Sequence, residues 1–120
     1  MRFVTYTILN EADDYIHVRL QPDGQPGGPD ALPDLASLLS ARPHPKTIVV
    51  DMAGIQWIDS SSIGGLIGLH KRCQEAGRHL ILHAVQPPVA DVLRFCKLDR
   101  LLTIKSGQAE ALALAVGGAK

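Results

Sequence analysis

Cysteines, aromatic residues and long apolar runs are all scarce in this chain of 120 residues. The two cysteines, Cys73 and Cys96, lack the spacing of a disulfide framework, which indicates a reducing, cytoplasmic setting. The two phenylalanines, two tyrosines and one tryptophan are too few for a base-stacking platform. No apolar run approaches the roughly 18 residues of a membrane-spanning helix. The polar, alternating first residues do not resemble a signal peptide.

An excess of charge of one sign is also missing. Lysine plus arginine and aspartate plus glutamate each number 12, so the formal net charge is zero. A general nucleic-acid binder needs a basic face, and the sequence gives no sign of one. The first 60 residues carry a net charge of −4 and the last 60 a net charge of +4. If the two halves interleave in one fold, these charges average out over an ordinary solvated surface, whereas a segregated basic face would suit an acidic partner.

Apolar residues make up 46% of the chain, and their spacing predicts strands and helices that alternate. Two segments rich in β-branched and aromatic residues, 3–9 and 15–20, predict an antiparallel hairpin because only a short polar turn joins them. A loop dense in proline and glycine follows at 21–30. The remaining predicted strands cover 47–50, 80–82 and 101–104, and the predicted helices cover about 32–41, 63–76, 86–96 and 108–116.

This order is β-β-α-β-α-β-α-β-α. Strands that alternate with helices predict a mostly parallel sheet, to which the first hairpin adds an antiparallel edge. Gly77 is expected to end the helix over 63–76 in a left-handed conformation. The sequence therefore predicts a single α/β domain over residues 1–120, with a mixed sheet of about five strands and about four helices.

The segment 59–66, DSSSIGGL, carries the strongest candidate chemistry. It connects a strand region to the start of a helix, at the end of the sheet where α/β proteins bind ligands. Aspartate and serine are common helix caps, so these side chains could serve only to satisfy free backbone N–H groups. Alternatively, a serine hydroxyl here could accept a phosphate, because the positive end of the helix dipole stabilises an anion. Gly64, Gly65 and Gly68 allow either close packing of the helix on the sheet or close approach of a partner.

Other groupings of reactive residues are weaker. His70 and Cys73 share a helix face but have no third ligand nearby in sequence, so we interpret them as packed core. His79 and His83 lie about 13 Å apart on an extended strand, too far to chelate one ion. The sequence contains no nucleophile elbow, P-loop or dinucleotide fingerprint. We therefore expect no metal, no cofactor and no enzymatic activity.

The stretch 48–51, IVVD, followed by 58–66, IDSSSIGGL, resembles the STAS domains of bacterial anti-sigma factor antagonists. Two downstream segments are similar as well: 77–82, GRHLIL, resembles the turn from helix to strand, and 89–102, VADVLRFCKLDRLL, resembles the third helix and the turn into the last strand. The resemblance covers roughly residues 46–116, and the order of elements extends it to the hairpin. It implies the STAS fold.

The resemblance also implies a function. Such proteins bind an anti-sigma factor, usually a serine kinase of the histidine-kinase-like ATPase type, and thereby release a sigma factor. The kinase phosphorylates the first serine after the aspartate, which ends binding, and a serine phosphatase restores it. That serine corresponds to Ser60 here. The implied partner contacts are Asp59, Ser61, Ser62, Ile63 and Gly64.

Two other functions stay open. The family's Gly-x-Leu-Asp segment after the second strand has no clear counterpart in 21–30, QPDGQPGGPD. The chain could therefore be an accessory STAS subunit of a lipid-transport, stress-signalling or sensor assembly without a role toward a sigma factor. A small enzyme that uses Ser60 or a histidine is the third candidate, and the lack of a base with an orienting partner counts against it.

Overall fold

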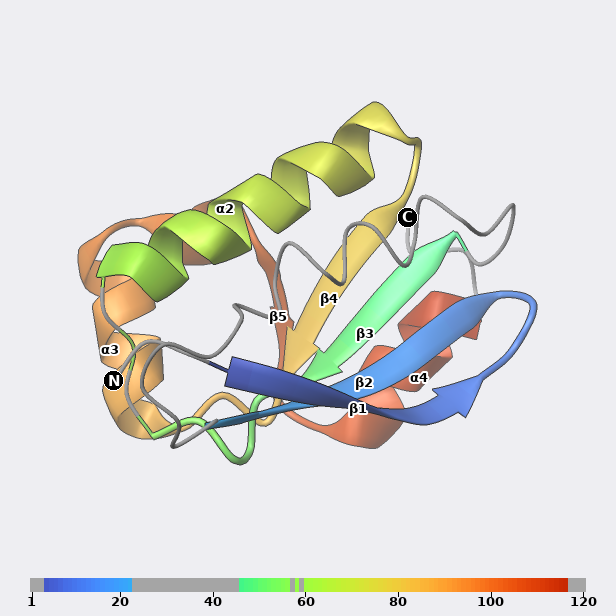
Figure 1. Cartoon of the computed structure of the whole chain (residues 1–120), viewed down its shortest axis with the longest axis horizontal. Helices are drawn as coiled ribbons and strands as arrows, with labels where there is room; N and C mark the ends of the chain where they lie inside the picture. Colours follow the sequence, from blue (N-terminus) through green and yellow to red (C-terminus); the bar gives the residue numbers. More distant parts are fainter. Residues whose placement is uncertain (1–3, 23–45, 57, 59, 117–120) are drawn as a thin grey trace.

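The computed structural model describes residues 4–22, 46–56, 58 and 60–116. Five strands form one sheet in the order β1-β2-β3-β4-β5, as Figure 1 shows. The strands are β1 (Val4–Glu11), β2 (Tyr15–Pro22), β3 (Thr47–Asp51), β4 (His79–His83) and β5 (Thr103–Lys105). The helices are α2 (Ser60–Glu75), α3 (Pro87–Phe95), α4 (Gln108–Val116) and the short 3-10 helix η1 (Leu98–Arg100).

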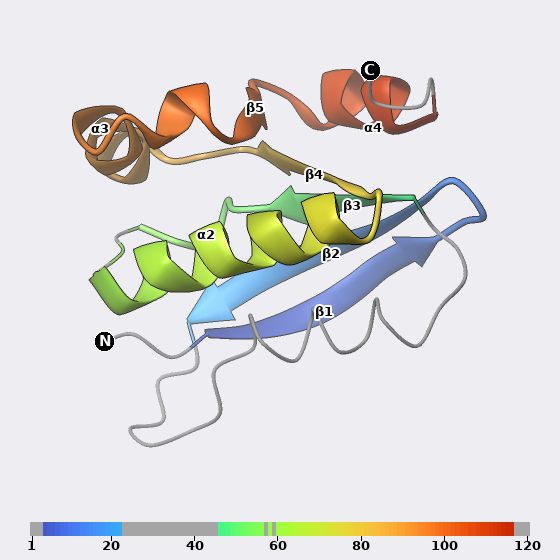
Figure 2. The ribbon, with the colours of Figure 1, turned by 90° about the horizontal axis from the view of Figure 1, so that it is seen from above.

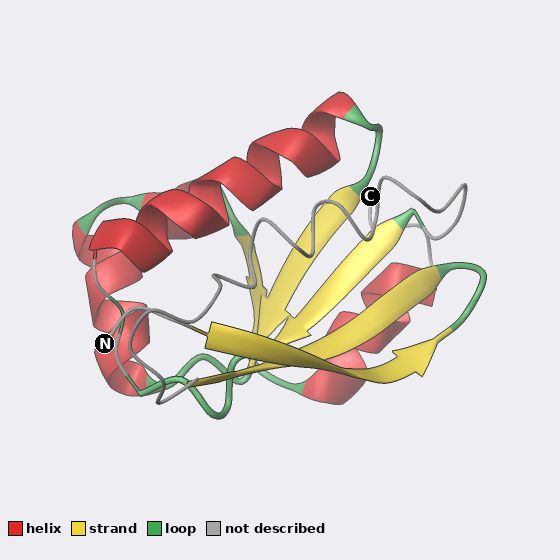
Figure 3. Cartoon of the chain, in the orientation of Figure 1, coloured by secondary structure: helices red, strands yellow, loops and turns green. Residues whose placement is uncertain are grey.

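The sheet is mixed, as the sequence predicts. β1 pairs with β2 antiparallel, with a register shift between Ile8 and Asn10, and forms one edge of the sheet. All other neighbouring strands are parallel, with Arg19 opposite Asp51 and Asp51 opposite His83. The carboxyl ends of β2, β3 and β4 therefore meet at one end of the sheet (Figure 3).

Helices cover both faces of this sheet, and Figure 2 shows α2 and α4 on opposite sides. Successive strand residues point to opposite faces, so each central strand contributes side chains to two hydrophobic cores. The larger core joins β2, β3 and β4 to α2 and α3 through Val18, Val50, Leu82, Leu66 and Leu93. The smaller core joins the other face to α4 through Val49, Ile81, Ala111 and Ala115.

The element predictions are largely confirmed, with two local corrections. The second predicted helix begins at Ser60 instead of residue 63, so the three serines form its first turn. The last strand covers Thr103–Lys105 instead of 101–104, because the preceding residues form η1 and the turn after it. Gly77 has φ +72°, the left-handed conformation expected after a helix end. The helix predicted over 32–41 lies outside the described residues.

None of the helices in the described ranges is both long and apolar enough to cross a membrane.

Candidate functional site

The connection from β3 to α2 leaves the sheet through a short turn. The Oδ1 atom of Asp51 accepts a hydrogen bond of 2.8 Å from the backbone N–H of Ala53, and the N–H of Ile55 donates to the Met52 carbonyl at 3.0 Å. Gln86, which precedes α3, donates its side-chain N–H to the Ala53 carbonyl at 2.7 Å. These bonds tie the connection to the end of the sheet from which α2 starts.

Gly54 in this connection has a close neighbour. A Cβ atom at position 54 would lie 3.2 Å from the Leu20 carbonyl oxygen of β2, tighter than ordinary contacts. The connection therefore passes directly against the end of β2, where a side chain would push it away.

The first turn of α2 contains the three serines Ser60, Ser61 and Ser62. Ser62 is buried, and residues four and seven positions later, Leu66 and Leu69, are buried in the larger core. By helical spacing, position 60 lies one turn before Gly64, which is exposed, and three and seven residues before Ile63 and Ile67, which pack against the larger core.

Two glycines of α2, Gly64 and Gly68, are not explained by close packing on the sheet. A Cβ atom added at Gly64 or Gly68 would meet nothing within 4 Å. Of the two alternatives left open by the sequence, close packing on the sheet does not apply to Gly64 and Gly68, because open space surrounds both positions. Gly64 and Gly68 lie four and eight residues after Ser60, so the face that follows Ser60 lacks side chains where another molecule could approach.

Replacing Gly68 by alanine should raise the free energy of unfolding by about 0.5–1 kcal/mol, because alanine is the better helix former and its methyl group meets no neighbour. Urea denaturation followed by circular dichroism measures the change. The same substitution at Gly77, where φ is +72°, provides the control and should destabilise. Destabilisation by the Gly68 substitution would contradict the open surroundings of this position.

The predicted site residues separate into three groups. Asp59 lies outside the described residues, and for Ser60 and Ser61 the structure describes the helical backbone. Ser62 is buried and Ile63 is half-buried against the larger core, while Gly64 is exposed. The structure therefore brings 60–64 together in one helical segment but directs Ser62 to the interior side.

A second polar cluster, which the sequence analysis missed, lies at the same end of the sheet. Its members are His17 and Arg19 of β2, Asp51 of β3 and His83 of β4. The Nε2 atoms of His17 and His83 are 2.9 Å apart. Arg19 donates two hydrogen bonds to the Oδ2 atom of Asp51, from Nε at 3.1 Å and from an Nη atom at 3.0 Å. We call this group the histidine cluster.

Burial sets the protonation of the histidine cluster. The pKa of His17 is lowered by desolvation and then by the neighbouring His83, and the pKa of His83 is lowered mainly by desolvation. Desolvation alone would raise the pKa of Asp51, but the Ala53 N–H and the Arg19 guanidinium outweigh it and hold the pKa below its usual value of 3.8. At neutral pH the cluster therefore contains two neutral imidazoles beside an ion pair.

Strand alternation predicts part of the histidine cluster, and the pairing of the strands supplies the rest. His17 and Arg19 are two residues apart in β2, so they share a sheet face. Parallel pairing then sets Arg19 beside Asp51 and Asp51 beside His83, on the same face as Val49 and Ile81. The sequence analysis compared His83 only with His79, in the same strand. It missed His17, which lies two strands away in β2, because the sequence does not reveal how the strands pair.

Cys73 is confirmed as a core residue. It is buried in the larger core, and desolvation raises the pKa of its thiol to about 11. The thiol therefore stays protonated and is a poor metal ligand at neutral pH. His70 is half-buried, and its Nε2 atom has no hydrogen-bond partner among the described residues.

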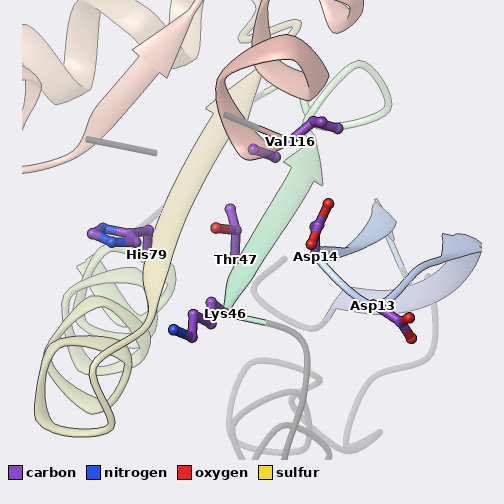
Figure 4. Close-up of a pocket in the computed structure, with 7 residues that line it drawn as sticks. Asp13, Asp14, Lys46, Thr47, His79 and Val116 are labelled. Atoms are coloured by element: carbon purple, nitrogen blue, oxygen red, sulfur yellow. The ribbon is translucent and has the colours of Figure 1, made fainter. Parts of the chain in front are cut away.

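Two shallow hollows lie at the opposite end of the sheet, where β3 and β4 begin. One, of about 320 Å³, is shown in Figure 4 and is lined by Asp13, Asp14, Lys46, Thr47, His79, Ala115 and Val116. The other, of about 440 Å³, lies beside the end of α2 and shares His79 with the first. Neither hollow includes any residue of the helix start or of the histidine cluster.

Both the sequence and the structure of this chain are similar to those of known proteins. The sequence matches the family model of the STAS domain over residues 7–111. A substituted form of RsbS from Moorella thermoacetica has a TM-score of 0.74 at 20% identity, covering 94% of this chain and 96% of that one. The anti-sigma factor antagonist SpoIIAA in its unphosphorylated form has a TM-score of 0.71 at 18% identity, covering 94% and 97%.

A chain from the stressosome, described as a signal integration and transduction hub, has a TM-score of 0.71 at 22% identity, covering 95% of this chain and 99% of that one. At these identities the structural similarities show a shared α/β fold. Because the family model spans most of the sequence, the chain belongs to the STAS domain family.

Proposed function

We propose that this chain is an anti-sigma factor antagonist. It binds an anti-sigma factor that is a serine kinase of the histidine-kinase-like ATPase type, and so releases a sigma factor in the bacterial cytoplasm. That kinase phosphorylates Ser60, which ends binding, and a serine phosphatase reverses the modification. The chain acts by binding and not by catalytic turnover.

The observation that carries this proposal is the position of Ser60. It begins α2 at the carboxyl end of the sheet, one turn before exposed Gly64. Gly64 and Gly68 leave open space beside them, so a partner's backbone has room to approach the helix there. The proposed partner contacts at the start of α2 are Asp59, Ser61, Ile63 and Gly64. Ser62, which the sequence also predicts as a contact, is buried and is therefore not proposed as one.

Phosphorylation at this position acts through charge. A phosphoserine adds about −1.5 to −2 charges at pH 7. The positive end of the α2 dipole tolerates this charge within the chain, so the fold does not need to change. A partner surface that fits a neutral serine meets desolvation and like-charge repulsion instead, and dissociates faster.

Capture from the source cells tests the partner and the modification together. We expect a tagged chain to bring down an ATPase of the histidine-kinase-like class. Mass spectrometry should find a phosphate on the peptide that contains Ser60. With the captured kinase, Ser60→Asp should weaken binding at least about tenfold because it adds a permanent charge, whereas Ser60→Ala should bind like the wild type.

Gln74→Glu is the matched control, because it adds one negative charge to the exposed last turn of the same helix. It should leave binding unchanged. Equal binding by the wild type, Ser60→Asp and Ser60→Ala would show that Ser60 is not the switch.

An accessory role in a signalling assembly is the second candidate, and the similarity to a stressosome chain favours it over the other assemblies. In that role the same helix face would contact neighbouring subunits, with no sigma factor released. Capture of large assembly subunits without a kinase and without phosphate on Ser60 would support this candidate over the first.

A further inference from the structure

We propose that the histidine cluster is a binding site for one divalent transition-metal ion, with His17, Asp51 and His83 as its ligands. The three residues come from adjacent strands at the buried carboxyl end of the sheet. One ligand atom from each lies within 4.8 Å of the others. This inference does not depend on the proposed role toward a sigma factor.

The distances fit a shared ion. Zinc–nitrogen bonds are about 2.0–2.1 Å long, so two nitrogens at a right angle around one ion are about 2.9 Å apart. The Nε2 atoms of His17 and His83 are separated by 2.9 Å. A tetrahedral ion needs about 3.3 Å between the same atoms, which requires the rings to move apart by a few tenths of an ångström. Either geometry is within reach of these side chains.

The donor set selects the kind of ion. Calcium and magnesium prefer oxygen ligands, and this site offers two imidazole nitrogens with a single carboxylate. Two histidines and one carboxylate suit zinc, cobalt, nickel or iron(II), leaving at least one coordination position for water or a further ligand. All three side chains are already gathered, because their strands hold them in register.

All three proposed ligands are buried. His17, Asp51 and His83 are only 3%, 3% and 1% exposed. The ion would be bound through the Nε2 atoms, so it would leave unchanged the Nδ1 atom of His83, which has no hydrogen-bond partner among the described residues.

Arg19 competes with the ion for Asp51, since its guanidinium lies 3.0 Å from the Oδ2 atom. A carboxylate can accept about four hydrogen bonds through its two oxygens. Asp51 already accepts two from Arg19 and one from the Ala53 N–H, which leaves about one lone pair for a metal while Arg19 stays in place. The Arg19 side chain is 43% exposed and can turn toward solvent without burying a charge. A polar network without metal is the competing arrangement, and the experiment separates the two.

The test uses the tag-free full chain after treatment with EDTA. Calorimetric titration with Zn²⁺ should show one ion per chain, and Co²⁺ should develop the visible absorption of a nitrogen-liganded ion. His17→Gln and His83→Gln should each weaken Zn²⁺ binding at least about tenfold, as loss of a ligand requires. His79→Gln changes an exposed histidine of the same strand as His83 and should leave binding unchanged.

Nuclear magnetic resonance of the wild type avoids dependence on whether the variants fold. The ring nitrogen signals of His17 and His83 should change at one equivalent of Zn²⁺, while that of His79 should not. No binding by the wild type, or binding that both cluster variants retain, would overturn the proposal, and so would signals that change first at His79.

Discussion

Replacing Leu66 by alanine lowers the free energy of unfolding by about 3 kcal/mol, within the range of about 2–5 kcal/mol for buried leucines. Leu66 is 1% exposed and belongs to the larger core, through which α2 packs on the sheet. The substitution removes apolar contacts and leaves a cavity that rigid strands cannot close. Chemical denaturation of the purified variant measures the loss.

Leu101→Ala provides the matched control, because the same atoms are removed from a side chain that is 44% exposed. Its effect should be well under half that of Leu66→Ala. Equal losses for the two variants would mean that α2 does not depend on Leu66 for its packing. Because Ser60 and Leu66 lie on the same helix, loss of this anchor should also weaken binding of the proposed partner kinase.

The strands and helices with strong local signals were predictable from the sequence. The continuous apolar run at 47–50 indicates a strand covered on both faces, and β3 is buried on both of them. α4 has the predicted bounds, and Gly77 takes the predicted left-handed conformation. In each case the predicted feature lies within a few positions of the observed one, because the local sequence determines the local structure.

The start of α2 was less predictable because serines serve equally well before a helix and in its first turn. Apolar spacing begins only at Ile63, so the prediction omitted the turn that holds Ser60. β5 was misplaced for a similar reason, since the leucines at 101 and 102 extend an apolar run while their backbone completes the turn after η1.

The histidine cluster shows what local patterns leave out. His17 and His83 are 66 positions apart, and they meet only because β2 and β4 flank β3 in parallel register. The glycines of α2 were ambiguous for a different reason, because sequence does not reveal whether a neighbour fills the space beside a missing side chain. Both features depend on tertiary placement, which no local pattern in the sequence contains.

The stability of the metal-free protein should fall as the pH is lowered from 7.5 to 5.5. In the unfolded chain a histidine takes up a proton near pH 6.5. Desolvation keeps the pKa values of His17 and His83 lower in the folded chain, and the Asp51 carboxylate offsets this effect only in part. Unfolding therefore takes up protons below about pH 6.5, and the free energy of unfolding decreases with a slope of up to about 1.4 kcal/mol per pH unit for each histidine.

Asp51 contributes in a different range of pH. Its folded pKa lies below 3.8, so the stability that its ionised form provides is complete above the unfolded value and is lost only in more acidic solution. Urea denaturation in EDTA at pH 5.5, 6.5 and 7.5 thus measures the effect of histidines without that of Asp51. The double variant His17→Gln, His83→Gln should show a flatter dependence, whereas His79→Gln should behave like the wild type because His79 is exposed. The double variant has no buried imidazole left to take up a proton at this end of the sheet. If its free energy of unfolding still fell as steeply with pH, groups other than His17 and His83 would be responsible.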